Sequence, residues 1–154
     1  MSCTPDELAR RCADAMWADD AASQQLGMTI DAVGPGQATL SMTVRADMTN
    51  GHGIAHGGFI FALADSAFAF ACNSYNVRTV AQGADIVFVS PAHAHEHLVA
   101  AAVERHRYGR NGVYDVRVTS SDRVVAEFRG RSRTIGGEHV ADAGSPGHPG
   151  DRDG

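Results

Sequence analysis

The sequence predicts an α+β domain in which a curled antiparallel sheet of six strands surrounds one buried central helix. Residues 56–74 are apolar on nearly every side and rich in alanine, which indicates a helix enclosed by protein. Strand-like segments bounded by turn residues lie on both sides of that helix, two before it and four after it. A chain of 154 residues, 44% of them hydrophobic, is long enough to bury one such core.

The first part of the chain predicts an N-terminal helix and a hairpin. Residues 4–20 open with a Thr-Pro-Asp-Glu sequence, which is a typical helix start, and apolar side chains then recur at helical spacing. Residues 28–33 and 37–44 show partial alternation of apolar and polar side chains and flank a Gly-Pro-Gly turn. The polar loop at residues 45–53 then leads into the buried helix.

The second half of the chain predicts four more strands and a tail. The strand-like patterns, with turn residues between them, cover residues 79–89, 97–107, 113–119 and 124–135. From residue 136 onward no hydrophobic periodicity is present, so we expect a domain of residues 1–137 and a disordered C-terminal tail of residues 138–154. A buried helix inserted after a first hairpin favours the hotdog arrangement among the α+β folds.

Composition excludes several classes of protein. The formal net charge of −5 argues against nucleic-acid binding, and no apolar run approaches the roughly 20 residues that a membrane helix needs. The N-terminus carries no secretory signal, so we expect a cytoplasmic protein. Three cysteines without CxxC spacing predict neither a disulfide framework nor a zinc site. His93, His95 and His97 alternate around Glu96 in a polar turn, and we expect no metal there.

Two glycines, Gly57 and Gly58, open the buried helix. Glycines at a helix N-terminus allow a ligand to approach unpaired backbone N–H groups closely. The helix dipole favours developing negative charge at the same place, which is the requirement of an oxyanion hole. The alternative is that the two glycines only relieve packing at a crowded helix start.

Asp65 is the second candidate, because it lies in the middle of an apolar helix where an unpaired carboxylate is costly. It is a candidate general base or nucleophile, unless a donor such as Asn73 satisfies it within the core. Gly57 and Asp65 are separated by about 12 Å along one helix at 1.5 Å per residue. One helix therefore cannot bring both to one carbon atom, and a mechanism that uses both predicts a homodimer with a two-fold axis.

The segment from Asn50 to Ser74 reads NGHGIAHGGFIFALADSAFAFACNS and resembles the PaaI-type hotdog acyl-CoA thioesterases of phenylacetate catabolism. Two later segments, residues 112–115 and 128–137, resemble the same family, and the resemblance covers about residues 10–137. It implies hydrolysis of a CoA thioester to a free acid and CoA, with phenylacetyl or hydroxylated aryl-acetyl groups. It implies no cofactor, since coenzyme A is part of the substrate, and a homotetramer built from two dimers.

The resemblance also implies roles for individual residues. Asp65 corresponds to the catalytic carboxylate, Gly57 to the residue that supplies the oxyanion N–H, and His56 to a residue that shapes the same end of the site. Asn50 and His52 are expected near the thioester, although a loop-capping role for Asn50 is an alternative. These residues and the neighbouring Gly58 form the expected centre of the site.

Further candidates follow the helix. Arg110 and Asn111, in a predicted turn, are expected to contact CoA, and Gly83 to lie at the substrate. The sequence departs from related enzymes at Gly83, where Ser or Thr often holds the water, and at Asp19, where the N-terminal helix can supply Asn. A face of three arginines, at positions 129, 131 and 133, is either a solvated outer surface or a contact for CoA phosphates.

Two other functions stay open. Hotdog acyl-CoA hydratases or dehydratases pair a His with an acid and carry a Pro-rich loop beside the His. Here His52 precedes Asp65 without an intervening proline, which favours the thioesterase. A non-catalytic acyl-CoA-binding module would tolerate loss of Asp65 without losing binding.

Overall fold

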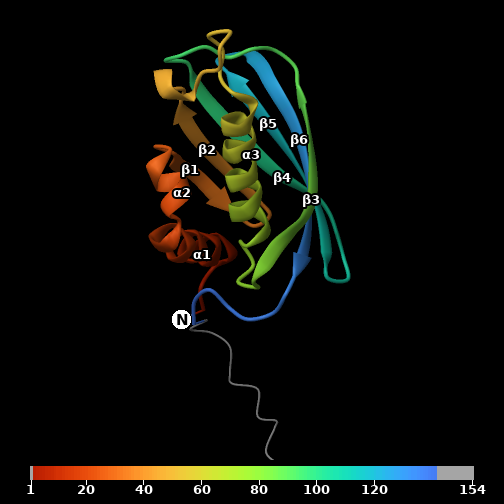
Figure 1. Ribbon diagram of the computed structural model, residues 1–154. Coiled ribbons are helices and arrows are strands. Elements are labelled where there is room, and N and C mark those ends of the chain that lie inside the picture. Colours follow the sequence, from red (N-terminus) through yellow and green to blue (C-terminus); the bar gives the residue numbers. More distant parts are fainter. Residues whose placement is uncertain (1, 142–154) are drawn as a thin grey trace, which may run out of the picture.

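The computed structural model describes residues 2–141 of the chain (Figure 1). Its elements, in chain order, are α1 (Pro5–Asp19), α2 (Ala21–Gln25), β1 (Thr29–Gly34), β2 (Gln37–Thr43), the 3-10 helix η1 (Ala46–Met48), α3 (Gly57–Cys72), β3 (Thr79–Phe88), β4 (His97–Tyr108), β5 (Asn111–Ser120) and β6 (Arg123–Thr134). The six strands form one antiparallel sheet in the order β1-β2-β4-β5-β6-β3. This sheet curls around α3, which confirms the predicted hotdog fold (Figure 1).

The predicted N-terminal helix is α1, and its start is set by a capping box. The Thr4 side chain accepts a hydrogen bond from the Glu7 backbone, and the Glu7 carboxylate accepts one from the Thr4 N–H. The short helix α2 follows at once, and the Asp20 side chain caps it by accepting from the Ser23 N–H at 3.0 Å. Five residues carry too little periodicity for α2 to be predicted from the sequence.

The core of the molecule lies between α3 and the concave face of the sheet. Eight of the sixteen residues of α3 are buried, and they pack against inward-facing side chains of the strands. The helix ends at Asn73, which is buried and whose Nδ2 donates to the carbonyl oxygens of Ala69 and Thr79. Asn73 therefore ties the helix to the start of β3. None of the helices in residues 2–141 is both long and apolar enough to span a membrane.

The sheet has two edges, and they are covered differently. The helix α1 packs against the β1 edge, whereas β3 forms the other edge and pairs with β6 alone among the described strands (Figure 1). No residue of β3 is fully buried. Large apolar side chains are exposed along and just after this strand, at Val80, Val87, Phe88 and Val89. The edge formed by β3 is therefore an unpaired, apolar one.

The C-terminal end of the described chain differs from the expectation. Residues 138–141, predicted to belong to a disordered tail, are hydrogen bonded to the domain. His139 Nε2 donates to Asn73 Oδ1 at 2.7 Å, and Asn76 Nδ2 donates to the carbonyl oxygen of Val140 at 2.9 Å. The expected boundary after Gly137 thus lies at least four residues too early. The rest of the predicted tail, residues 142–154, lies outside the described residues.

Candidate active site

The backbone N–H of Gly57 lies at the start of α3, where the first N–H groups of a helix have no partner within the helix. His56 is the N-cap, and its Nδ1 accepts a hydrogen bond from the Gly58 N–H at 3.0 Å. The Phe59 N–H donates to the carbonyl oxygen of His56 at 3.0 Å. Within residues 2–141 the Gly57 N–H has no acceptor. The Gly58 N–H is thus engaged in the helix cap, and its predicted contact with the substrate stays a prediction. Gly57 is the residue whose N–H is available to a ligand within residues 2–141.

A cavity of about 500 Å³ opens beside Gly57. It lies between the start of α3, the loop before it, and the segment that follows β3. Its lining residues are Asn50, Ile54, Ala55, Gly57, Ile60, Phe88, Val89, Ser90, Pro91 and Ala92. Among the described residues that line it, none carries a charge. The free N–H of Gly57 thus belongs to the wall of an apolar cavity at the positive end of a helix dipole.

Gly57 also has a packing role. A Cβ atom added at this position would lie 2.8 Å from Cζ of Phe88, which is closer than real Cβ contacts. A Cβ atom at Gly58 would lie 3.1 Å from Nδ1 of His56. The crowding at both positions agrees with the packing interpretation of the two glycines. The oxyanion hole stays a prediction, and the Gly57 N–H, which has no acceptor within residues 2–141, is available for it.

Asn50 and His52 were both expected near the thioester, and the structure separates them. Asn50 Oδ1 accepts hydrogen bonds from the N–H groups of His52, at 2.9 Å, and Ile54, at 3.4 Å, so it caps the loop. Asn50 also lines the cavity, and its Nδ2 donates to no described residue. His52 is exposed and does not line the cavity.

Asp65 lies two turns further along α3 and is half-buried. Burial raises the pKa of its carboxyl above the ordinary value. Among the described residues it accepts no hydrogen bond and forms no ion pair, and Asn73, the donor considered from the sequence, is bonded elsewhere. It does not line the cavity of Gly57 in the same chain. The carboxylate is therefore uncommitted, as a general base or nucleophile requires.

Gly83 lies in β3, beyond a register shift between Ala81 and Gly83. The side chain of the bulged residue, Gln82, donates to Asn111 Oδ1 at 2.7 Å and to the carbonyl oxygen of Ser132 at 3.0 Å. A Cβ atom at Gly83 would meet nothing within 4 Å, so open space borders this position. No described hydroxyl thus replaces the Ser or Thr of related enzymes at Gly83 itself.

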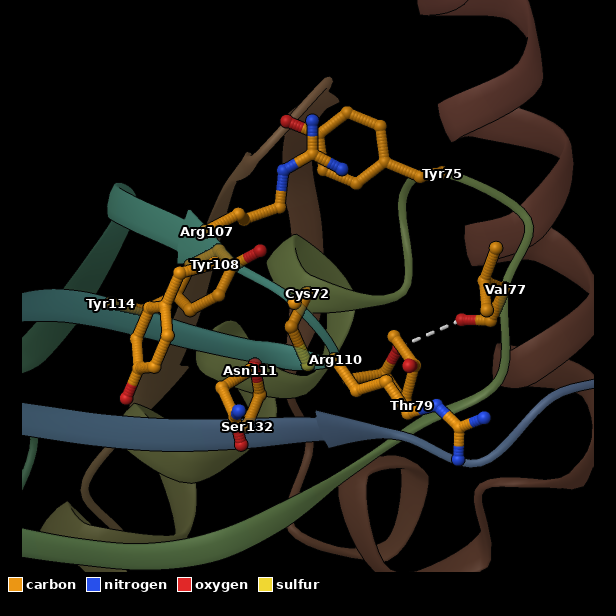
Figure 2. A pocket seen from close by; sticks show the side chains of 12 residues that line it. Cys72, Tyr75, Val77, Thr79, Arg107, Tyr108, Arg110, Asn111, Tyr114 and Ser132 are labelled. Atoms are coloured by element: carbon orange, nitrogen blue, oxygen red, sulfur yellow. Dashed lines mark hydrogen bonds between the residues drawn. The ribbon is translucent and has the colours of Figure 1, made fainter.

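Arg110 and Asn111 line a second cavity, of about 260 Å³, near the C-terminal end of α3 (Figure 2). On its wall the Arg107 guanidinium stacks on the Tyr75 ring, 3.7 Å from the centroid, and Arg107 Nε pairs with a Glu104 carboxylate oxygen at 2.9 Å. Cys72 also lines this cavity, and burial raises the pKa of its thiol to about 12, so the thiol is unreactive.

Other candidates from the sequence are engaged elsewhere. Arg129 forms two hydrogen bonds with the Asp115 carboxylate, at 2.7 and 2.9 Å, on the exposed face of the sheet. Arg131 pairs with Asp85 at 2.9 Å in the same way. These pairs agree with the interpretation of the arginines as a solvated outer surface. Glu96 accepts from the Ser120 hydroxyl and pairs with an arginine.

Within a single chain, the predicted site residues thus lie in two groups near opposite ends of β3. Asn50 and Gly57 lie at the end where β3 finishes, and Asn111 and Gly83 lie toward the end where β3 begins. Phe88, which borders Gly57, was not predicted. The sequence offered no signal for it, because an apolar residue at the end of a strand is common in any core.

The chain is similar to known thioesterases over most of its length. The family model described as the thioesterase superfamily matches residues 52–127. The acyl-coenzyme A thioesterase PaaI of Escherichia coli is 43% identical over 132 residues, which make up 85% of this chain and 94% of that protein.

Two solved structures extend this similarity to the fold. The E. coli PaaI protein from the phenylacetic acid degradation operon has a TM-score of 0.86 at 42% identity, covering 88% of this chain and 99% of that one. A mutant of the phenylacetic acid degradation protein PaaI from Thermus thermophilus has a TM-score of 0.71 at 38% identity, covering 73% of this chain and 97% of that one. The chain therefore belongs to the thioesterase superfamily and, within it, to the family of PaaI acyl-coenzyme A thioesterases.

Proposed function

We propose that the protein hydrolyses phenylacetyl-CoA or a hydroxylated aryl-acetyl-CoA to the free acid and CoA. The observation that carries this proposal is the unpaired N–H of Gly57, which opens into an apolar cavity at the start of α3. A donor fixed at the positive end of a helix stabilises the negative charge that develops on a thioester oxygen during attack. Family membership and the chemistry of this helix start support the same reaction.

The reaction needs a base or a nucleophile opposite that donor, and Asp65 is the uncommitted carboxylate. Asp65 of the partner subunit would take a proton from water as the water oxygen attacks the thioester carbon. The C–S bond then breaks, and the CoA sulfur leaves and takes up a proton. In the alternative route the carboxylate attacks the thioester carbon, the C–S bond breaks, and the CoA thiolate leaves and is protonated. Water then hydrolyses the mixed anhydride, which releases the acid and regenerates the carboxylate. A raised pKa makes the Asp65 carboxylate a better base than an ordinary one.

A homodimer would bring Gly57 of one chain close to Asp65 of its partner, which one chain cannot do by itself. We propose that two copies pair their β3 edges in antiparallel fashion, which satisfies the unpaired backbone groups and covers exposed apolar side chains of the outer face such as Val80. Antiparallel pairing about a two-fold axis brings the end of one β3 beside the start of the other. The cavity of Gly57 in one chain would then lie near the Gly83 and Asn111 end of its partner. A tetramer of two such dimers stays a prediction from the resemblance.

The charged half of the substrate requires cationic partners. Arg107 and Arg110 line the second cavity, and within residues 2–141 Arg110 forms no ion pair (Figure 2). Guanidinium groups form strong, charge-assisted hydrogen bonds with phosphate oxygens. We propose that Arg110 and Asn111 contact CoA, and that no cofactor is required. The free thiols of Cys3, Cys12 and Cys72 suit a reducing compartment, which supports a cytoplasmic location.

A thiol-release assay with phenylacetyl-CoA, acetyl-CoA and crotonyl-CoA tests the function. We expect free CoA from phenylacetyl-CoA, and a loss of at least about 10²-fold in kcat for Asp65→Asn, the low end for losing a general base. Binding of a non-hydrolysable CoA thioether should persist in that variant. Asp85→Asn, an exposed carboxylate on β3, is the matched control. Loss of the crotonyl double bond without thiol release would identify a hydratase instead, and binding without any turnover would identify a binding module.

A further inference from the structure

We infer that the apolar cavity beside Gly57 receives the acyl group of the substrate, and that Phe88 determines which acyl groups it accepts. The inference rests on the proposed thioesterase function and deepens it, because it assigns one half of the substrate to one cavity. It means that uncharged acyl groups are accepted and that acyl groups ending in a carboxylate are rejected.

The first argument is the direction of the Phe88 side chain. In the β3–β6 register Phe88 lies opposite Ala126, and Ile86 lies opposite Phe128, and both of these β6 residues are buried. Phe88 therefore belongs to the inward-facing set of β3. Its side chain is nevertheless 52% exposed, because no other part of the described chain covers it. An inward-facing aromatic ring that stays uncovered is a surface available to a ligand.

The second argument is the distance between this ring and the free N–H. The Phe88 ring packs against Gly57 so closely that an added Cβ atom would lie 2.8 Å from Cζ. A thioester oxygen that accepts a hydrogen bond from the Gly57 N–H sits roughly 3 Å from that nitrogen. The carbon atoms attached to the carbonyl therefore begin within a few bonds of the ring. Either the acyl group or the thiol arm must contact Phe88.

The third argument is charge, which distinguishes those two halves. The cavity is lined mainly by aliphatic and aromatic side chains, and no charged group occurs among its described lining residues. Behind the wall, Arg123 donates to Ser90 Oγ and to the Pro91 carbonyl oxygen, and its charge is paired with Glu96. Transferring a carboxylate or a phosphate into such surroundings without a partner is costly. The other cavity has Arg107 and Arg110 on its wall. Charge complementarity therefore places the CoA phosphates toward the arginines. The thiol arm then runs from Gly57 in the direction of the phosphates, which leaves the apolar cavity and Phe88 to the acyl group.

The test compares kcat/KM ratios between pairs of substrates. Phenylacetyl-CoA against acetyl-CoA measures the preference for a ring, and butyryl-CoA against malonyl-CoA measures rejection of a carboxylate at similar size. We expect Phe88→Ala and Phe88→Leu to lower the first ratio by about tenfold or more, the scale of discrimination by an apolar pocket. We expect Phe88→Arg to lower the butyryl to malonyl ratio by about as much, because a guanidinium would offer the carboxylate a partner.

Matched control variants distinguish an effect of the Phe88 ring from a general effect of changing the β3 edge. Val87 precedes Phe88 on the same strand and is 61% exposed, and its β6 partner, Glu127, lies on the outer face with Arg117. Val87→Ala should therefore leave both ratios at their wild-type values. Val103, an exposed outer-face residue of β4 away from the β3 edge, supplies the arginine control, and Val103→Arg should also leave both ratios unchanged. Size-exclusion chromatography of every variant verifies the assembly, and Phe88→Leu keeps an apolar edge if Phe88→Arg does not assemble.

The outcomes distinguish this inference from the function on which it rests. If the wild-type protein hydrolyses none of the four thioesters, the proposed function is wrong. If it hydrolyses them, but malonyl-CoA as fast as butyryl-CoA, the assignment of the acyl group to this cavity is overturned and the thioesterase function stands. Unchanged ratios in assembled Phe88 variants overturn the role of Phe88 in the same way.

Discussion

The Phe88 ring and the Gly57 backbone are in direct contact at the point where α3 begins, and a methyl group on residue 57 would come within 2.8 Å of Cζ of Phe88. The same glycine carries the N–H that has no acceptor within the described residues. Glycine at this position therefore serves two purposes, clearance for the ring and access to a donor. These two purposes can be tested separately by substitutions that remove the clearance for the ring and keep the N–H, or the reverse.

Gly57→Ala keeps the N–H and adds the methyl group, so it tests clearance alone. We expect it to lower kcat/KM for phenylacetyl-CoA by about tenfold in the wild-type background, because the ring must move. In the Phe88→Ala background the same change should cost much less, since the two residues are in contact and their effects are not additive. Steady-state kinetics of the four proteins measure the coupling. Equal losses in both backgrounds would mean that the methyl group obstructs the substrate directly.

We expect the ionised carboxylate of Asp65 to destabilise the folded protein. Burial raises the pKa of its carboxyl above 3.8, so the charged form is disfavoured in the folded state. That cost is fully present above the raised pKa and disappears as the pH falls from this value to 3.8, the value expected when unfolded. Asn cannot ionise, so Asp65→Asn should raise Tm at neutral pH and lose this advantage in acid. Differential scanning calorimetry over a pH series measures the difference.

Asp115→Asn is a control of opposite sign for that measurement. A hydrogen bond from Arg129 is the main cause that lowers the pKa of the Asp115 carboxyl below 3.8. Its contribution to stability is present above 3.8 and is lost as the pH falls through the lowered pKa. The control variant should therefore have a lower Tm than the wild type at neutral pH. A lower Tm for Asp65→Asn as well would contradict the view that its carboxylate is unpaired.

The parts of the fold that could be predicted are those whose signals are local. The apolar run of α3 predicted a buried helix, and turn residues delimited the hairpins, because periodicity and turn chemistry act over a few residues. The helix α2 was missed because five residues carry too little periodicity, and residues 138–141 were missed because distant partners hold them. Ser23 of α2 bonds to Ser66 on α3 at 2.9 Å, and Val140 bonds to Asn76. Such contacts leave no pattern in the segment that makes them.

The same distinction between local and distant signals applies to the residues of the candidate site. Gly57 and Asp65 could be identified from the sequence because both residue types are unfavourable in an apolar helix. Glycine has a low helix propensity, and a carboxylate is costly to bury. Phe88 is an aromatic residue in a strand, which is common and gives no signal in the sequence. Only the sheet register and the exposed fraction show that it faces inward and is not covered by the described chain. Asn50 combines both outcomes, because it caps its loop, as one alternative held, and also lines the cavity.

The contacts of residues 138–141 predict the effect of shortening the chain. Removing residues 138–154 deprives Asn73 and Asn76, which are buried, of partners supplied by His139 and Val140. Asn73 Oδ1 keeps the hydrogen bond from the Thr79 N–H, but Asn76 Nδ2 loses its described acceptor. A buried polar group left unpaired costs about 1–3 kcal/mol, so we expect Tm to fall by several degrees. A chain that ends at residue 141 keeps these bonds and should melt as the full-length protein does. Thermal denaturation of the two truncated chains compares them, and equal Tm values would mean that the contacts contribute nothing.

Mixed dimers test whether each site uses two chains. Asp65→Asn removes the carboxylate, and Gly57→Pro removes the N–H, although proline is otherwise accepted at the first position of a helix. Both homodimers should be inactive. In a heterodimer, one site combines the intact Gly57 of the first chain with the intact Asp65 of the second, and the other site receives both defects. Two differently tagged chains, refolded together and purified through both tags, supply this species for the thiol-release assay.

The shared-site geometry predicts activity approaching half that of the wild type from two inactive parents. A site built within one chain would leave one defect in each site of the heterodimer, and no activity would return. A proline ring in place of Gly57 also presses on Phe88, so circular dichroism must first establish that the Gly57→Pro chain folds. Gly57→Ala, which keeps the N–H, measures the part of the loss that comes from this contact. A folded, purified heterodimer without recovered activity would refute the two-chain site, because the roughly 12 Å between the two groups along α3 would then have to be bridged within one chain.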